Sequence, residues 1–127
     1  MKKILSYLLL VPAMLLIAIP AVQAADSAIS TMAGIVMHLN HYPDSSEMKT
    51  LADISHNQHA TSGEKQLANA LMHFHHRVTE GDAPLLRQLQ GDAAASAQEK
   101  ELAAILLGIA HHPSASDKQR LRALTDD

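Results

Sequence analysis

The sequence predicts an all-α protein built from three tandem helical hairpins, which give six short helices stacked as a small α-solenoid or bundle. Three observations predict this fold: an internal repeat of 35 residues, an apolar stripe of helical spacing in each copy, and helix-capping pairs at fixed positions. No segment shows the apolar–polar alternation of a half-buried strand. One hairpin of this size cannot bury its apolar side alone, so the three copies are expected to share one core.

The repeat is visible when Met32–Ile54 is aligned, without gaps, with Leu67–Leu89 and Leu102–Leu124. The segments "TSGEKQLA" and "SAQEKELA", which precede the second and third copies, match as well. The aligned columns hold Ala33, Ala68 and Ala103; His41, His76 and His111; Glu47, Asp82 and Asp117; and Leu51, Leu86 and Leu121. We therefore divide the chain into repeats 26–60, 61–95 and 96–127, all within one domain that spans residues 25–127.

The first helix of each repeat, called helix A, carries apolar residues at positions i, i+3, i+4 and i+7, as an amphipathic helix does. These residues are Met32, Ile35, Val36 and Leu39, then Leu67, Ala70, Leu71 and Phe74, then Leu102, Ile105, Leu106 and Ile109. Capping boxes formed by Thr61 with Glu64 and by Ser96 with Glu99 begin helix A in two copies. Proline at 43 and at 113 is expected to end helix A shortly after the shared histidine.

The second helix, helix B, is expected to begin directly after helix A. Its start is predicted by a capping residue three positions before a carboxylate: Asp44 with Glu47, Thr79 with Asp82, and Ser114 with Asp117. A carboxylate in the first turn is stabilised by the positive end of the helix dipole. Helix B has a thin apolar stripe, such as Leu51 and Ile54, and the segments "HNQHA" and "GDAAA" link one repeat to the next.

Residues 1–24 are predicted to be a signal peptide. Lys2 and Lys3 give a basic start, Ile4–Ile19 is almost wholly apolar, and Val22-Gln23-Ala24 offers the small residues that a signal peptidase recognises. The alternative is an uncleaved membrane anchor, but this run is shorter than the ~20 residues that span a bilayer. We therefore expect cleavage after Ala24 and a protein located in the periplasm or secreted.

The composition of the chain excludes several classes of function. The whole chain has 10 basic and 13 acidic residues, so loss of Lys2 and Lys3 changes its net charge from −3 to −5, which disfavours nucleic acid as a partner. The absence of cysteine excludes disulfides, thiol catalysis and covalently attached haem. No later segment is apolar enough to anchor the mature chain stably in a membrane.

All nine histidines lie in the mature chain and fall into two sets. The first is the repeated column, placed at the expected end of helix A, where an imidazole can bond the last carbonyls and complement the negative helix end. A role common to all repeats cannot explain the others: His38 and His73 share a column in which the third repeat has Gly108. Solvent-exposed variation remains an alternative for this second set.

Helical geometry predicts a metal site on the first two repeats. If helix A continues through the shared histidine, it presents one methionine and two histidines away from the apolar stripe. The predicted ligands are His38, His41, His73 and His76, with Met37, Met72 and His75 nearby. Imidazole suits zinc, copper and nickel, and thioether adds a preference for Cu(I). The two methionines could instead pack against a second face of the core.

Three functions remain open from the sequence. The first is an exported metal-binding protein that buffers or delivers copper, zinc or nickel. The second is a protein–protein interaction module, an adaptor or chaperone with structural histidines, since helical repeats offer extended binding faces. The third is a pH sensor, because protonation of nine histidines would change the net charge from −5 to +4.

Enzymatic activity is not expected. The sequence has no HExxH motif, no glycine-rich phosphate loop and no G-x-S-x-G motif. Its serines and acids lie at helix caps, where capping explains them. With one Phe, two Tyr and no Trp, the chain offers little aromatic wall for a large flat cofactor, so neither haem nor a nucleotide is expected.

Overall fold

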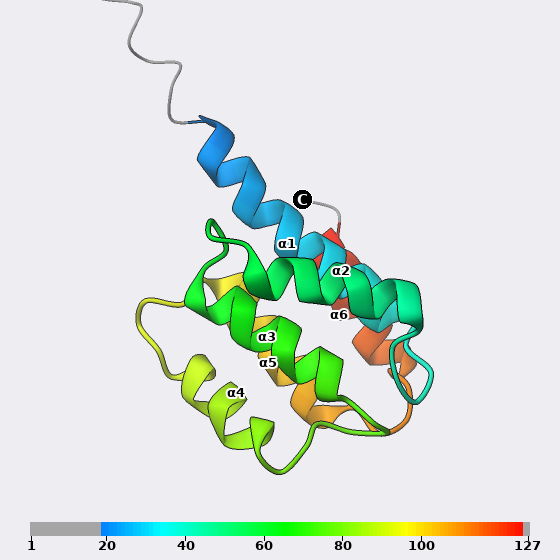
Figure 1. Ribbon diagram of the computed structural model, residues 1–127. Coiled ribbons are helices and arrows are strands. Elements are labelled where there is room, and N and C mark those ends of the chain that lie inside the picture. The colour runs from blue at the N-terminus through cyan, green and yellow to red at the C-terminus, as the bar shows by residue number, and fades with distance from the viewer. Residues whose placement is uncertain (1–18, 126–127) are drawn as a thin grey trace, which may run out of the picture.

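The computed structural model describes residues 19–125, with side chains from Ala28 onward. The six helices are α1 (Ile19–Met37), α2 (Ser45–His56), α3 (Ser62–His73), α4 (Asp82–Gln90), α5 (Ala97–Gly108) and α6 (Ala115–Thr125) (Figure 1). Between residues 19 and 125 the only β-structure is three isolated bridges. The predicted all-helical fold with six helices is therefore confirmed; α1, α3 and α5 are the A helices, and α2, α4 and α6 are the B helices.

The predicted signal peptide lies outside the described residues, apart from positions 19–24. The backbone of these positions forms the beginning of α1, which extends beyond the other helices (Figure 1). Export and cleavage after Ala24 therefore stay predictions. In the described part of the chain, none of the helices combines the length and the apolar character that crossing a membrane requires.

The predicted capping residues begin most of the helices. Reciprocal capping boxes join Asp44 to Glu47, Thr61 to Glu64, and Ser96 to Glu99 at the starts of α2, α3 and α5. Ser114 and Asp117 exchange the same pair of bonds before α6, both at 3.0 Å. At α4 the Asp82 N–H donates to Thr79 Oγ1, but regular helix begins only at Asp82. Local capping chemistry thus sets where these helices start.

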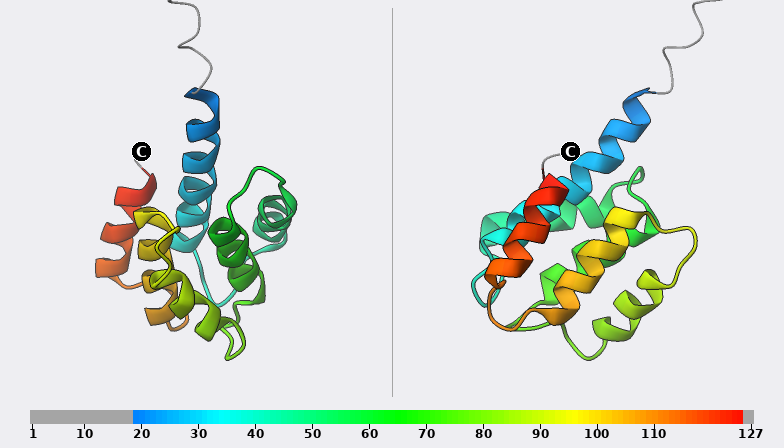
Figure 2. Two further views of the ribbon diagram at one scale, coloured as in Figure 1. Left: turned by 90° about the vertical axis from the view of Figure 1, so that its left-hand side faces the viewer. Right: turned by 180° about the vertical axis from the view of Figure 1, so that it is seen from behind.

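The six helices close into a ring. Each B helix packs most extensively against the A helix of the next repeat: α2 against α3, α4 against α5, and α6 against α1. The three A helices also contact one another in pairs at the centre. Ser30 Oγ donates to the Thr125 carbonyl at 3.3 Å, which adds a bond between α1 and the end of α6. The packing pattern thus repeats cyclically through the three repeats, and Figure 2 shows α6 beside α1. The predicted stack of tandem hairpins is not confirmed, because each B helix packs less against the A helix of its own repeat than against the next one.

The core is formed by the repeated apolar columns. Of the predicted A-helix stripe, every member is buried, and so is the B-helix column of Leu51, Leu86 and Leu121. Met37, Ile54 and Met72 are partly buried and pack against this core. Burial of one such large side chain contributes about 1.5–3 kcal/mol. All three repeats contribute to a single cluster, as expected for hairpins that cannot bury their apolar sides separately.

The A helices end earlier than the sequence predicts. They stop at Met37, His73 and Gly108, three or four residues before the shared histidines. The next apolar residues, Leu39, Phe74 and Ile109, are buried, and Phe74 and Ile109 have extended backbone. Their N–H groups bond carbonyls three residues back, which tightens the last turn. The prediction that the shared histidines lie within helix A is therefore wrong. The last apolar residue of each stripe is buried in the core although it follows the end of the helix.

The N-terminal ends of α3 and α5 are joined by a hydrogen bond to the buried carboxylate of Glu99. Thr61, the N-cap of α3, donates its hydroxyl to Glu99 Oε2 at 2.5 Å. Glu99 is only 4% exposed, and its other carboxylate oxygen accepts the Ser96 N–H of its own capping box. A Cβ at Gly63 would lie 2.5 Å from that oxygen, so the approach of the two helices depends on a residue without a side chain.

Candidate metal centre

The shared histidines adopt a backbone conformation that is unusual for their residue type. His41, His76 and His111 have φ values of 72°, 69° and 71°, and they are the only non-glycine residues with positive φ in the described chain. The Tyr42 N–H donates to the Asn40 carbonyl at 2.9 Å, which closes a three-residue turn around His41. Such γ-turns with positive φ are rare and strained. The positive φ is common to all three shared histidines, and this repetition points to a functional constraint.

The main chains of the three histidines are hydrogen-bonded in a ring. The N–H of His41 donates to the carbonyl of His111 at 2.7 Å, that of His76 to His41 at 2.6 Å, and that of His111 to His76 at 2.6 Å. The segments after α1, α3 and α5 meet at one end of the molecule to form this ring (Figure 1). These three bonds hold the backbones of the shared histidines next to one another.

The three imidazoles lie close together beside this ring. The Nδ1 atoms of His41 and His76 are 3.0 Å apart, and those of His76 and His111 are 2.9 Å apart. The ring centroids are separated by 4.8, 4.9 and 5.4 Å, and each pair meets edge to face. Each residue offers one nitrogen that lies within 4.8 Å of the other two. We call this cluster of His41, His76 and His111 the histidine triad.

Hydrogen bonds alone satisfy the ring nitrogens of the histidine triad poorly. A neutral imidazole carries one N–H, so each Nδ1 either donates or accepts. The Nδ1 of His76 makes both short contacts, and it must therefore share one proton between two acceptors or one lone pair between two donors. Three imidazolium ions would repel one another. A metal cation, in contrast, accepts the lone pairs of all three nitrogens at once.

The surroundings of His76 oppose its protonation. Its pKa is lowered from the ordinary value by partial burial, by His75, His41 and His111, and by the neighbouring Arg77. A lowered pKa keeps the imidazole neutral at mildly acidic pH, and neutral imidazole is the form that ligates metals. The charge environment thus favours the metal-binding state of this residue.

The spacing of the nitrogens suits a first-row transition metal. Zinc binds imidazole nitrogen at about 2.0–2.1 Å, which separates two ligands of a tetrahedral site by about 3.3–3.4 Å. Two separations in the histidine triad, 3.0 and 2.9 Å, are a few tenths of an ångström shorter than this, and all three nitrogens lie within 4.8 Å of one another, so side-chain rotation would bring them to this spacing. His41 and His76 are partly buried while His111 is exposed, so solvent can reach a fourth position.

Of the seven ligands predicted from the sequence, the structure brings together His41 and His76. The third member of the triad, His111, was assigned to the same column but not to the metal site. The repeat alignment could have included His111, because a histidine stands at this position in every repeat. In a closed ring of repeats, the three residues of such a column can meet. Within residues 19–125 these imidazoles donate to no helix-end carbonyl, and their Nδ1 atoms face one another instead.

The other predicted ligands have separate contacts. His38 Nδ1 bonds the Gly34 carbonyl of its own helix at 3.0 Å, and His73 Nδ1 pairs with Asp82 at 2.9 Å. His75 stacks on Tyr42 with parallel rings 5.5 Å apart and meets His76 edge to face. Met37 and Met72 pack against the core, as the alternative for them supposed. His75 is thus the one of these five that borders the histidine triad.

Comparisons of the chain with protein-family models, with curated proteins and with solved structures found no match.

Proposed function

We propose that the protein binds one transition-metal ion through His41, His76 and His111. The observation that carries this proposal is the convergence of three ring nitrogens on one point, from residues that share a strained backbone conformation. Each such conformation costs of order 1–3 kcal/mol and persists where the surrounding structure or a function requires it. Binding of one cation by three imidazoles gives each of the three strained conformations a function.

The donor set favours zinc, Cu(II) or nickel. Imidazole suits all three ions, whereas the preference for Cu(I) came from thioether ligands. Met37 and Met72 are engaged in core packing, which weakens that argument. Three protein nitrogens leave a fourth position for water or for a donor from another molecule.

A partly exposed site with three ligands suits an ion that is taken up and released. We therefore propose that the protein buffers or delivers its ion, and that it does so in the periplasm or outside the cell, as the leader-like sequence suggests. The competing function, a docking module for other proteins, needs an extended exposed apolar face. Within the described side chains, the large apolar residues that are exposed are Tyr42 and Leu85. Two separate exposed residues do not make the extended apolar face that docking needs.

Metal titration of the purified protein tests the proposal. Calorimetry with Zn²⁺, Cu²⁺ and Ni²⁺ should give one ion per chain for at least one metal, and elemental analysis of protein purified without chelators should detect that metal. His76→Asn should lower the affinity at least tenfold, because asparagine tolerates positive φ but removes the central imidazole. The folded backbone is thereby retained while the ligand is lost.

The matched control is His38→Asn, which removes an exposed imidazole outside the histidine triad. It should leave stoichiometry and affinity unchanged. Equal losses in both variants would mean that scattered surface histidines bind the metal, and this outcome would overturn the proposal. Failure of all three metals to bind would overturn it as well.

A further inference from the structure

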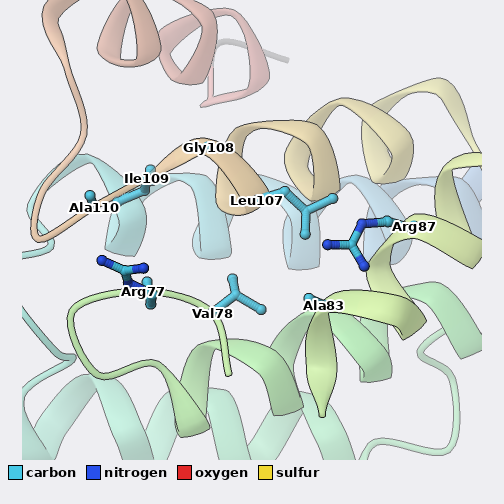
Figure 3. Close-up of a pocket in the computed structure, with 8 residues that line it drawn as sticks. All are labelled: Arg77, Val78, Ala83, Arg87, Leu107, Gly108, Ile109 and Ala110. Carbon is cyan, nitrogen blue, oxygen red and sulfur yellow. The ribbon is translucent and has the colours of Figure 1, made fainter. Parts of the chain in front are cut away.

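A second candidate site lies next to the histidine triad, between repeats two and three. It is a cavity of ≈ 310 Å³ between the beginning of α4 with the segment before it and the end of α5 (Figure 3). Its walls are formed by Arg77, Val78, Ala83, Arg87, Leu107, Gly108, Ile109 and Ala110. Its volume is at the lower end of the range typical of small-molecule sites. Arg77 directly follows His76, and Ala110 directly precedes His111, so the two sites are neighbours.

Both arginines of this cavity lack an anionic partner. The ion pairs of the described residues join His73 to Asp82 and Arg120 to Glu101 and Asp117, and they include neither Arg77 nor Arg87. The two guanidinium groups stand at opposite ends of the lining, with Val78 and Leu107 between them (Figure 3). The carbonyl end of α5 also borders the cavity, but its partial charge of about −0.5 is small beside two full positive charges.

The cavity is open because of Gly108. A Cβ at this position would meet no atom within 4 Å, and Gly108 does not have positive φ, so neither crowding nor backbone conformation requires glycine. The same column holds His38 and His73 in the other repeats. The absence of a side chain at residue 108 therefore leaves this space free.

The arginine pair is also specific to this interface. In the repeat alignment, Arg77 corresponds to Tyr42 and His112, and Arg87 corresponds to Ala52 and Arg122. The interface between repeats two and three is therefore the one that carries two arginines at these columns. Arg77 and Gly108 differ from both other members of their columns, whereas Arg87 matches Arg122. Their combination places two positive charges at one cavity in a chain with net charge −3.

We propose that this cavity binds a small organic dianion, an aliphatic dicarboxylate whose two ends pair with Arg77 and Arg87 and whose methylene groups lie on Val78 and Leu107. Guanidinium groups bind carboxylates through paired charge-assisted hydrogen bonds. Val78 and Leu107 supply the apolar surface between the two charges. This binding does not depend on an ion at the histidine triad, so the two proposals can fail separately.

Calorimetry with the metal-free full chain tests the proposal, with succinate as the probe and succinamide and acetate as controls. Succinate should bind with one site per chain, succinamide should not bind, and acetate should bind at least tenfold more weakly. Equal affinity for acetate and succinate would overturn the two-ended arrangement, and absence of succinate binding would overturn the site.

Two variants and a matched control locate the binding. Arg87→Gln removes one charge, and Gly108→Gln fills the cavity with a side chain close in size to the histidine of the other repeats; each should weaken succinate binding at least tenfold. Arg122→Gln removes the corresponding exposed arginine of the third repeat and should change the affinity less than twofold. An equal loss in Arg122→Gln would show general charge attraction and would overturn the proposal. An unchanged far-ultraviolet circular dichroism spectrum and thermal unfolding midpoint in Gly108→Gln would confirm that the variant is folded.

Discussion

The main-chain N–H of His41 donates to the carbonyl of His111 at 2.7 Å, and this bond joins the first repeat to the last. The same relationship links His76 to His41 and His111 to His76, so the chain has no free end repeat. Tandem repeats that stack openly need special capping units, because their terminal faces are exposed. Here α6 covers α1, and each repeat serves as the cap of another.

Ring closure predicts that the three repeats contribute equally to the free energy of unfolding. Leu51, Leu86 and Leu121 occupy one column and are all almost completely buried. Substitution of any one by alanine should lower the free energy of unfolding by about 2–5 kcal/mol. Urea denaturation of the three variants measures this. In an open stack Leu121, in the terminal helix, would cost clearly less than Leu86, and such a result would contradict the ring.

The strained conformation of His111 predicts opposite effects for two substitutions. Glycine adopts positive φ without steric cost, so His111→Gly should leave the free energy of unfolding unchanged or raise it by up to about 1 kcal/mol. Valine is β-branched and should lower the free energy of unfolding by about 1–2 kcal/mol. Thermal denaturation of the metal-free variants separates the two. Both should lose metal affinity, and a stable glycine variant with unchanged affinity would remove His111 from the ligand set.

Acidification should destabilise the metal-free protein through His76. Because its pKa is lowered in the folded state, the unfolded chain takes up this proton at higher pH than the folded chain does. The contribution of His76 to stability is therefore fully present above the unfolded pKa of about 6.5 and is lost as the pH falls through the lower folded value. Urea denaturation between pH 7.5 and 5 measures this loss. His76→Asn should show a shallower pH dependence, and an unchanged slope would rule out the effect.

The close approach of α3 and α5 predicts that one methyl group added at Gly63 lowers the free energy of unfolding. Gly63→Ala would place a Cβ 2.5 Å from Glu99 Oε1 and 2.9 Å from Leu89 Cδ1, so it should destabilise the protein by about 1–3 kcal/mol. Gly34→Ala is the control: it lies inside α1, where a Cβ would meet no atom within 4 Å. This variant should instead be stabilised by up to about 1 kcal/mol, because alanine favours the helix. Similar effects of the two changes would contradict the close approach at Gly63.

Metal binding and acid should compete at the histidine triad. Each ligand must be deprotonated, so affinity should fall as the pH drops. Since the pKa of His76 is lowered, the fall attributable to this residue should begin below pH 6.5. Zinc titrations at several pH values measure it, and a pH-independent affinity between 7.5 and 5 would exclude imidazole ligation.

The helices could be predicted from the sequence because their signals are local. Capping pairs such as Thr61 with Glu64 and the spacing of the apolar columns depend only on neighbouring residues, and the structure contains both. The ends of the A helices could not be predicted in this way. Leu39, Phe74 and Ile109 continue the helical spacing, yet they are buried after the helix has ended.

The candidate site depends on contacts between distant repeats, and its prediction was therefore incomplete. Spacing along one helix favoured His38 and His73 as partners of the shared histidines, whereas the structure pairs His73 with Asp82 and directs His38 to its own helix. His111 joins the triad only because α6 returns to α1 and closes the ring. Nothing local to residues 102–124 indicates that return.

The closed arrangement of α2 on α3, α4 on α5 and α6 on α1 has a consequence for the repeat as an independent molecule. Each repeat presents two different surfaces that fit together head to tail, and the rotation between neighbours closes after three steps. A peptide that contains only residues 61–95 should therefore self-assemble as a homotrimer, with three copies of His76 on an exact symmetry axis. The chain itself departs from that symmetry at Arg77 and Gly108, which differ from both other members of their columns.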